Sequence, residues 1–169
     1  MEQIAQASSV SRSTLYVHFQ DKDQLLQQIA EDYGTALCTI VDRLPRLLRS
    51  RAEIRSWIDE LASFIARERI PSVLITRIAE RDDSPASVRQ IGDQLVAKLA
   101  QRLPGLADAL GAKSTREHAL AHVMVVLREL GWACLQAARR CDGVGAALVS
   151  IAADTFDRFV RAYAVKGGA

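Results

Sequence analysis

Residues 1–34, MEQIAQASSVSRSTLYVHFQDKDQLLQQIAEDYG, carry the pattern that decides the fold. A short helix is predicted over residues 2–7. A second is predicted over residues 12–19 and begins after Ser11, because serine is a favourable N-cap residue. Only Ser8, Ser9 and Val10 separate the helix over 2–7 from this cap. Two short helices joined by so tight a turn indicate a helix-turn-helix.

Apolar and polar side chains separate on these two predicted helices. The residues able to form one small apolar cluster are Ile4, Ala5, Val10, Leu15 and Phe19. The polar side chains left outside it suit DNA, because arginine pairs with guanine while hydroxyl groups reach base edges or phosphates. The residues that we predict to contact DNA are Ser11, Arg12, Ser13, Thr14, Tyr16, His18 and Lys22.

The string IAQASSVSRSTLYVHFQDKDQLL resembles the DNA-binding signature of the TetR family of bacterial one-component transcriptional regulators, which are usually repressors. Its most specific part is TLYVHF with Lys22 shortly after it. The resemblance implies that Ser11 to Phe19 match the recognition helix. It also implies that the positions matching Tyr16, His18 and Lys22 touch phosphates. The remaining residues resemble the family only in forming a helical domain of suitable length.

The segment also departs from the family pattern. The family places a further helix before the part that starts here at Met1, so we expect an N-terminally truncated helix-turn-helix, or else a product that has lost DNA binding. Residues 1–35 contain two basic and five acidic side chains. Bulk charge therefore gives no support to DNA binding, which needs cations that neutralise phosphates.

Composition limits the class of protein. The chain has 169 residues, 49% of them hydrophobic and 25% charged, which is ordinary for a soluble protein of one or two domains. Three cysteines without CxxC spacing, together with the lack of an apolar run of eighteen residues, indicate a cytoplasmic protein with no membrane partner. No nucleophile elbow, P-loop or dinucleotide-binding motif occurs. We therefore predict neither an enzyme nor a cofactor, and no catalytic residue.

The rest of the chain has helical periodicity and no strand pattern, so we expect an all-α fold with a helix-turn-helix over residues 1–34 and a ligand-binding, dimerising domain over residues 35–169. Gly34 lies inside a long predicted helix, as a hinge between these parts or as a site of close packing. The predicted helices cover residues 22–48, 52–70, 72–81, 87–103, 118–138 and 146–165, with a turn over 104–111.

The two C-terminal helices predict a homodimer. Residues 118–138 are apolar around most of the helix axis, which requires burial on two sides, one against the core and one against a partner subunit. With residues 146–165 they would form a four-helix interface about a twofold axis. On the outer face of the last helix we expect two ion pairs in water, Asp154 with Arg158 and Asp157 with Arg161.

Candidate ligand-binding residues are aromatic or polar side chains on mostly apolar helices. His118 and His122 have the i, i+4 spacing that allows two imidazoles to share Zn²⁺, but no third ligand is evident. We therefore predict no metal site and assign both histidines to a small-molecule pocket, for which ordinary core packing is the alternative. The candidate pocket residues are Trp57, Phe64, Arg77, His118, His122 and Trp132.

Together these patterns predict a DNA-binding transcriptional regulator, a repressor released from its operator by a small molecule. The partners that this predicts are operator DNA, a small-molecule effector and a second copy of the chain. The alternative is a helical dimer that binds a small molecule or a protein partner without binding DNA. The acidic balance of residues 1–35 favours the alternative, and the intact TLYVHF string favours the regulator.

Overall fold

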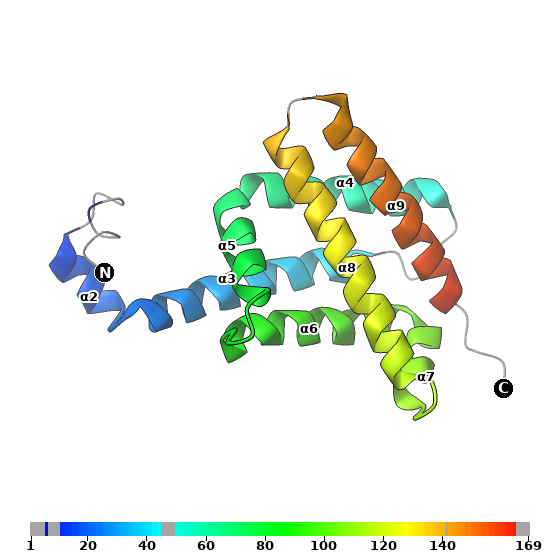
Figure 1. The fold of residues 1–169 in the computed structure, drawn as a ribbon, viewed down its shortest axis with the longest axis horizontal. Coiled ribbons are helices and arrows are strands. Elements are labelled where there is room, and N and C mark those ends of the chain that lie inside the picture. Colours follow the sequence, from blue (N-terminus) through cyan, green and yellow to red (C-terminus); the bar gives the residue numbers. More distant parts are fainter. Residues whose placement is uncertain (1–5, 7–10, 45–49, 141, 165–169) are drawn as a thin grey trace.

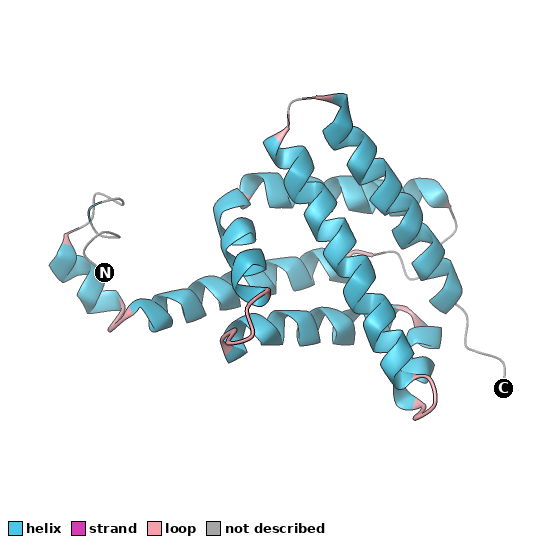
Figure 2. Cartoon of the chain, viewed as in Figure 1, coloured by secondary structure: helices cyan, strands magenta, loops and turns pink. Residues whose placement is uncertain are grey.

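A computed structural model describes residue 6 and residues 11–44, 50–140 and 142–164 (Figure 1). Within these ranges every regular element is a helix, which confirms the all-α prediction (Figure 2). The predicted helix over residues 2–7 lies outside the described residues except for Gln6. The helices are α2 (Arg12–His18), α3 (Lys22–Asp42), α4 (Arg51–Arg67), α5 (Arg69–Ala79), α6 (Ala86–Arg102), α7 (Pro104–Gly111), α8 (Arg116–Arg139) and α9 (Gly143–Tyr163).

The long helix α3 connects α2 to the helical body. α2 stands apart at the N-terminal end of α3, while the C-terminal part of α3 runs into the body beside α6 (Figure 1). α8 and α9 pack against each other, and α4 contacts both of them. α2 therefore lies away from the core, and α3 alone connects it to the helical body.

The main core lies where α4, α8 and α9 meet α3, α6 and α7. Phe156 of α9 is fully buried and stacks on Trp57 of α4, with ring centroids 5.0 Å apart. The Trp57 indole N–H donates a 2.7 Å hydrogen bond to the carbonyl oxygen of Ile40 near the end of α3. One buried tryptophan thus connects three helices, and its polar atom is satisfied.

A smaller apolar cluster joins α3 to α5 and α6, and it consists of Ala30, Ile75, Val88 and Ile91. Gly34 is buried beside it, and helix α3 runs through this glycine without a break. A Cβ atom at residue 34 would lie 3.1 Å from Cγ1 of Ile91. Close packing of α3 on α6 is therefore sufficient to account for glycine at this position.

Several predicted helix boundaries differ from those observed. α3 ends at Asp42, and the predicted continuation to residue 48 enters residues 45–49, which lie outside the described residues. The break predicted before Pro71 falls earlier, at Glu68, and Pro71 occupies the first turn of α5. Proline is tolerated there because the first N–H groups of a helix have no partner within the helix. Residues 104–111, predicted as a turn, form helix α7 with Pro104 as its first residue.

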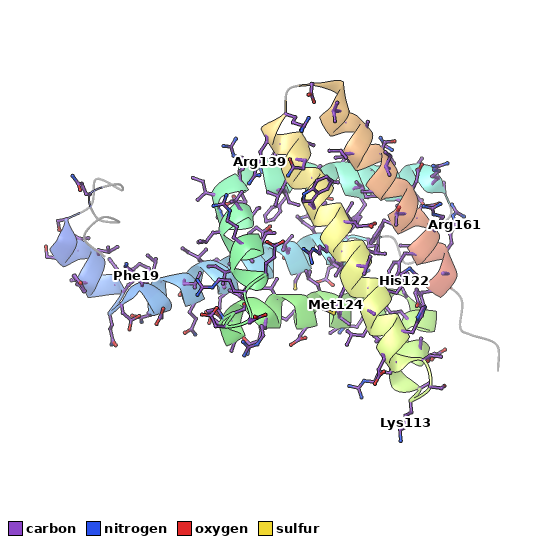
Figure 3. The ribbon with its side chains drawn as sticks, viewed as in Figure 1. Phe19, Lys113, His122, Met124, Arg139 and Arg161 are labelled. Carbon is purple, nitrogen blue, oxygen red and sulfur yellow. The ribbon has the colours of Figure 1, made fainter. Side chains whose placement is uncertain are left out.

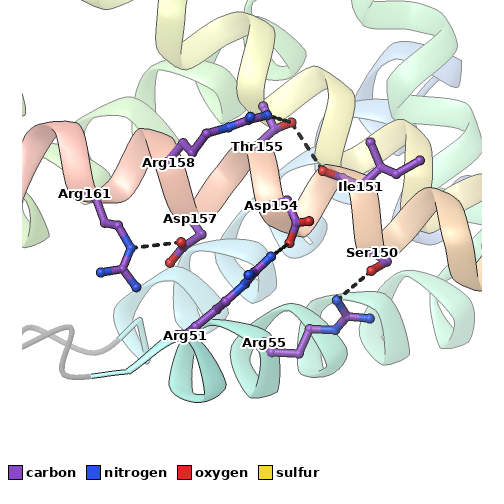
Figure 4. A network of polar contacts seen from close by, with 9 residues as sticks. All are labelled: Arg51, Arg55, Ser150, Ile151, Asp154, Thr155, Asp157, Arg158 and Arg161. Carbon is purple, nitrogen blue, oxygen red and sulfur yellow. Dashed lines mark hydrogen bonds and ion pairs between the residues drawn. The ribbon is translucent and has the colours of Figure 1, made fainter.

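The ion pairs of α9 are confirmed only in part (Figure 4). Arg161 Nε donates to Asp157 Oδ2 at 2.9 Å, as predicted. However, Asp157 is only 9% exposed, so the prediction that this pair lies in water was wrong for the carboxylate. Asp154 pairs with Arg51 of α4 instead of Arg158, because the first turn of α4 packs alongside this face of α9.

Candidate nucleic-acid interface

Helix α2 begins at a well-formed cap. The Ser11 side-chain oxygen accepts a 3.0 Å hydrogen bond from the backbone N–H of Thr14. The same oxygen lies 2.9 Å from Ser13 Oγ and 2.7 Å from Thr14 Oγ1. Three hydroxyl groups are thus gathered at the N-terminus of α2, where the helix dipole and free N–H groups favour a phosphate or another anion.

The end of α2 and the start of α3 fix how the two helices meet. Leu15 is buried, and the backbone N–H of Phe19 closes α2 by donating to the Leu15 carbonyl oxygen at 2.9 Å. Asp21 Oδ1 then caps α3 by accepting a 2.8 Å hydrogen bond from Gln24 N. The Gln24 side chain in turn accepts from the backbone N–H of Gln20 at 2.6 Å. These bonds set the orientation of α2 relative to α3.

The predicted DNA-contacting residues form one accessible surface. Six of the seven side chains are exposed on α2, its cap and the first turn of α3, and Tyr16 is 44% exposed. The side chain of the seventh, Arg12, lies outside what the structure describes. Lys22 is the first residue of α3, so its positive charge lies next to α2. The surface combines hydroxyl, phenol, imidazole and ammonium groups, a set suited to phosphates and base edges.

Comparison with known proteins agrees with this surface. Residues 1–29 match the family model of bacterial regulatory proteins, tetR family. This N-terminal segment is of the TetR type. It contains α2 and the first turns of α3, and its match supports a DNA-binding transcription regulator. No curated protein and no solved structure matches it.

Val17 of α2 was not among the predicted DNA-contacting residues. Val17 is 79% exposed, whereas apolar residues of a small domain are normally turned inward. It follows Ser13 by four residues, so both side chains lie on one face of α2. The signal was available in the sequence, because Val17 has no place in the apolar cluster that includes Leu15 and Phe19.

The predicted ligand-pocket residues are dispersed in the structure. Trp57 and Phe64 are buried in the core, and Phe64 stacks on Tyr33 with ring centroids 5.6 Å apart. Arg77 and Trp132 are exposed. His118 and His122 are the two candidates that come together.

These two histidines line a shallow cavity of about 340 Å³ on the outer side of α8. Ala121 and Val125 complete the lining, and His122 is seen on α8 in Figure 3. His118 is exposed and His122 is half-buried. The structure therefore offers an open apolar depression with two imidazoles, while Trp57 and Phe64 have clear packing roles.

Among the described residues, α8 is the one helix long and apolar enough to cross a membrane by length and composition. Its inner side includes Val123, Val126 and Leu130, which are buried against the other helices of the body. A core helix passes the same test as a membrane span. The packing of α8 against α4, α7 and α9 accounts for the apolar residues on its inner side.

Proposed function

We propose that this TetR family chain is a cytoplasmic, ligand-responsive repressor that binds operator DNA as a homodimer and is released by a small molecule. The observation that carries the proposal is the N-terminus of α2, where Ser11, Ser13 and Thr14 are exposed on a capped helix within the family-matched segment. In a helix-turn-helix this end of the second helix enters the major groove. We assign effector binding and dimerisation to residues 35–169.

An outward-facing apolar surface supports the homodimer. α8 and α9 lie together on one side of the body, and Met124 is seen on α8 in Figure 3. Exposed apolar patches of this kind mark interaction sites, and a second copy would cover the surface symmetrically. Two copies would present two α2 helices to a palindromic operator. We define the dimer face as Leu120, Met124, Val125, Trp132, Val144 and Ile151, which are 38–66% exposed.

The contacts between α3 and α6 support a coupling between effector and DNA. Lys98 Nζ of α6 lies 2.7 Å from Asp42 Oδ2 of α3, and Arg102 lies 3.4 Å from the other carboxylate oxygen. Gly34 packs closely on Ile91 at the other end of the same contact. A shift of α6 on effector binding would therefore move α3 and change the spacing of the two α2 helices, which lowers operator affinity. Of the six predicted effector contacts, His118 and His122 are the two that line one cavity, and we propose these two as effector contacts.

Selection of bound duplexes from a random pool tests the proposal directly. The full chain should enrich a palindromic sequence, and its affinity should fall steeply with salt because phosphate contacts release counterions. Ser13→Ala, which changes one exposed hydroxyl on α2, should reduce the enrichment while leaving the far-ultraviolet circular dichroism unchanged. A folded dimer that enriches no sequence would contradict DNA binding and favour the helical dimer without DNA affinity, the alternative that the acidic residues 1–35 support.

Lys22→Ala should weaken binding to all duplexes alike. The ammonium group is exposed at the start of α3, where an interaction with a phosphate carries no sequence information. The slope of log affinity against log salt should become shallower by about one for each phosphate that no longer meets an ammonium group, or about two per dimer. Fluorescence anisotropy over a salt series measures this slope. Arg12→Ala is the contrasting variant, because removing a side chain that reads a base should change sequence preference instead.

Val17 should read a thymine. The thymine methyl group is the apolar feature of the major groove, and an exposed valine on the recognition helix matches it. Replacing the contacted thymine by deoxyuridine removes one methyl group, which should cost about 0.8 kcal/mol, or roughly four-fold in affinity. The same replacement in the operator should not change the affinity of the Val17→Ser variant. Equal sensitivity of both proteins at every thymine of the operator would show that Val17 does not contact the base.

A further inference from the structure

Two of the three histidines of this chain lie one turn apart on α8. The His118 and His122 rings have centroids 6.2 Å apart and are tilted by 55°. Both belong to the outer side of the helix, and both line the cavity of about 340 Å³. At this separation the two imidazoles can turn one nitrogen each toward a single ion, because side chains at i and i+4 lie above one another on a helix.

The His122 ring is already held in place. Its Nδ1 atom lies 3.3 Å from the Tyr163 hydroxyl, and its ring is perpendicular to that of Phe159 with centroids 5.1 Å apart. When Nδ1 carries the hydrogen and donates it to the tyrosine oxygen, Nε2 keeps its lone pair. Metal-binding histidines are commonly oriented in this way, with the second ring nitrogen hydrogen-bonded to a neighbouring group.

The residues that line the cavity determine which class of metal ion could bind there. Besides the two imidazoles the cavity is lined by Ala121 and Val125, so no carboxylate and no cation belongs to the lining. Neutral imidazoles suit Zn²⁺, Ni²⁺ and Cu²⁺, whereas Mg²⁺ and Ca²⁺ require oxygen ligands. The described residues include no group of three or more His, Cys, Asp or Glu side chains that could hold a metal. A site here therefore has two protein ligands.

We propose that His118 and His122 bind one divalent transition-metal ion of the Zn²⁺ class through two imidazole nitrogens, with water in the remaining positions. The sequence analysis predicted no metal site because a third ligand was lacking. The structure adds the neighbouring rings, their shared cavity and the Tyr163 contact, which together place two imidazoles beside one open volume. The open positions would accept a donor atom from a small ligand. This proposal does not depend on DNA binding.

Titration of the full chain with Zn²⁺ alone tests the site. Isothermal calorimetry should show one binding event per chain that is abolished or strongly weakened in His118→Ala. Two ligands on one scaffold act with a high effective concentration, so removal of one should lower the affinity roughly 100-fold. His118 is exposed, and its replacement leaves the core intact. His18, the third histidine, is exposed alone on α2, so His18→Ala is the matched control and should bind as the unchanged chain does.

Two further readouts separate a built site from incidental binding. In long-range proton–nitrogen spectra, Zn²⁺ should shift one ring nitrogen of His118 and of His122 and leave His18 unchanged. Tyr163→Phe should weaken binding by about ten-fold, because it removes the group that orients His122. Equal affinity of the His118→Ala and His18→Ala chains, or equal shifts at all three histidines, would overturn the proposal.

Discussion

Met124→Asp should convert the proposed dimer into a monomer and reduce operator affinity by at least about 100-fold. Met124 is 60% exposed on α8 and belongs to the proposed dimer face. In a twofold interface each substitution occurs twice, and an unpaired charge taken from water into an apolar contact costs about 3–5 kcal/mol. The single chain loses little, because exposed substitutions usually change stability by less than about 0.5 kcal/mol. Sedimentation velocity measures the assembly, and anisotropy measures the affinity.

Ile70→Asp provides the matched control for this substitution. Ile70 is 81% exposed at the start of α5, so the change in charge and apolar surface is similar while the position is outside the dimer face. This chain should remain dimeric and keep its affinity. If Met124→Asp sedimented as the same dimer, the interface would have to lie elsewhere. If Met124→Asp became monomeric but kept its affinity for operator DNA, binding would not require two α2 helices.

Phe156→Ala should cause the largest loss of stability. The ring is fully buried, stacked on Trp57 and 6.0 Å from Phe159 by ring centroids. Removing a buried phenyl group loses its transfer free energy and leaves a cavity, which costs about 3–5 kcal/mol. For a chain of this length the midpoint of thermal unfolding should fall by about 6–20 °C. Scanning calorimetry measures this midpoint. The protein concentration is kept fixed, because the midpoint of a dimer depends on concentration.

A conservative variant at residue 156 separates the effect of lost apolar volume from the effect of the lost aromatic ring. Phe156→Leu keeps most of the apolar volume and should cost clearly less than the alanine variant. Trp57 emission should also change in the alanine variant, because the ring that stacks on the indole is gone. A midpoint within about 2 °C of the unchanged chain, equivalent to roughly 1 kcal/mol, would show that Phe156 does not anchor the core.

The predictions from sequence were most successful where a local signal decides the structure. Ser11 caps α2 as predicted, since its side chain acts on a backbone group within one turn. The helix predicted after Ser11, within the family-matched residues 1–29, is observed as α2 for the same reason. The α4–α5 boundary was missed because Pro71 is compatible with the first turn of a helix as well as with its end.

Contacts between residues far apart in the chain could not be predicted from the sequence patterns. Asp154 pairs with Arg51, which is 103 residues away, so the nearer Arg158 was a reasonable but wrong choice of partner. Trp57 illustrates the same limit at the candidate ligand site. An aromatic residue on an apolar helix has the same pattern whether it lines a pocket or fills a core, and only the stack on Phe156 distinguishes the two environments.

The fit of Gly34 against Ile91 has an evolutionary consequence. Because a Cβ atom at residue 34 would meet Ile91 Cγ1 at 3.1 Å, the two side chains share one volume at the crossing of α3 and α6. A methyl group gained at residue 34 would therefore require Ile91 to shift by a few tenths of an ångström or to be replaced by a smaller residue. Substitutions at these two positions are expected to be coupled, although they lie 57 residues apart in the chain.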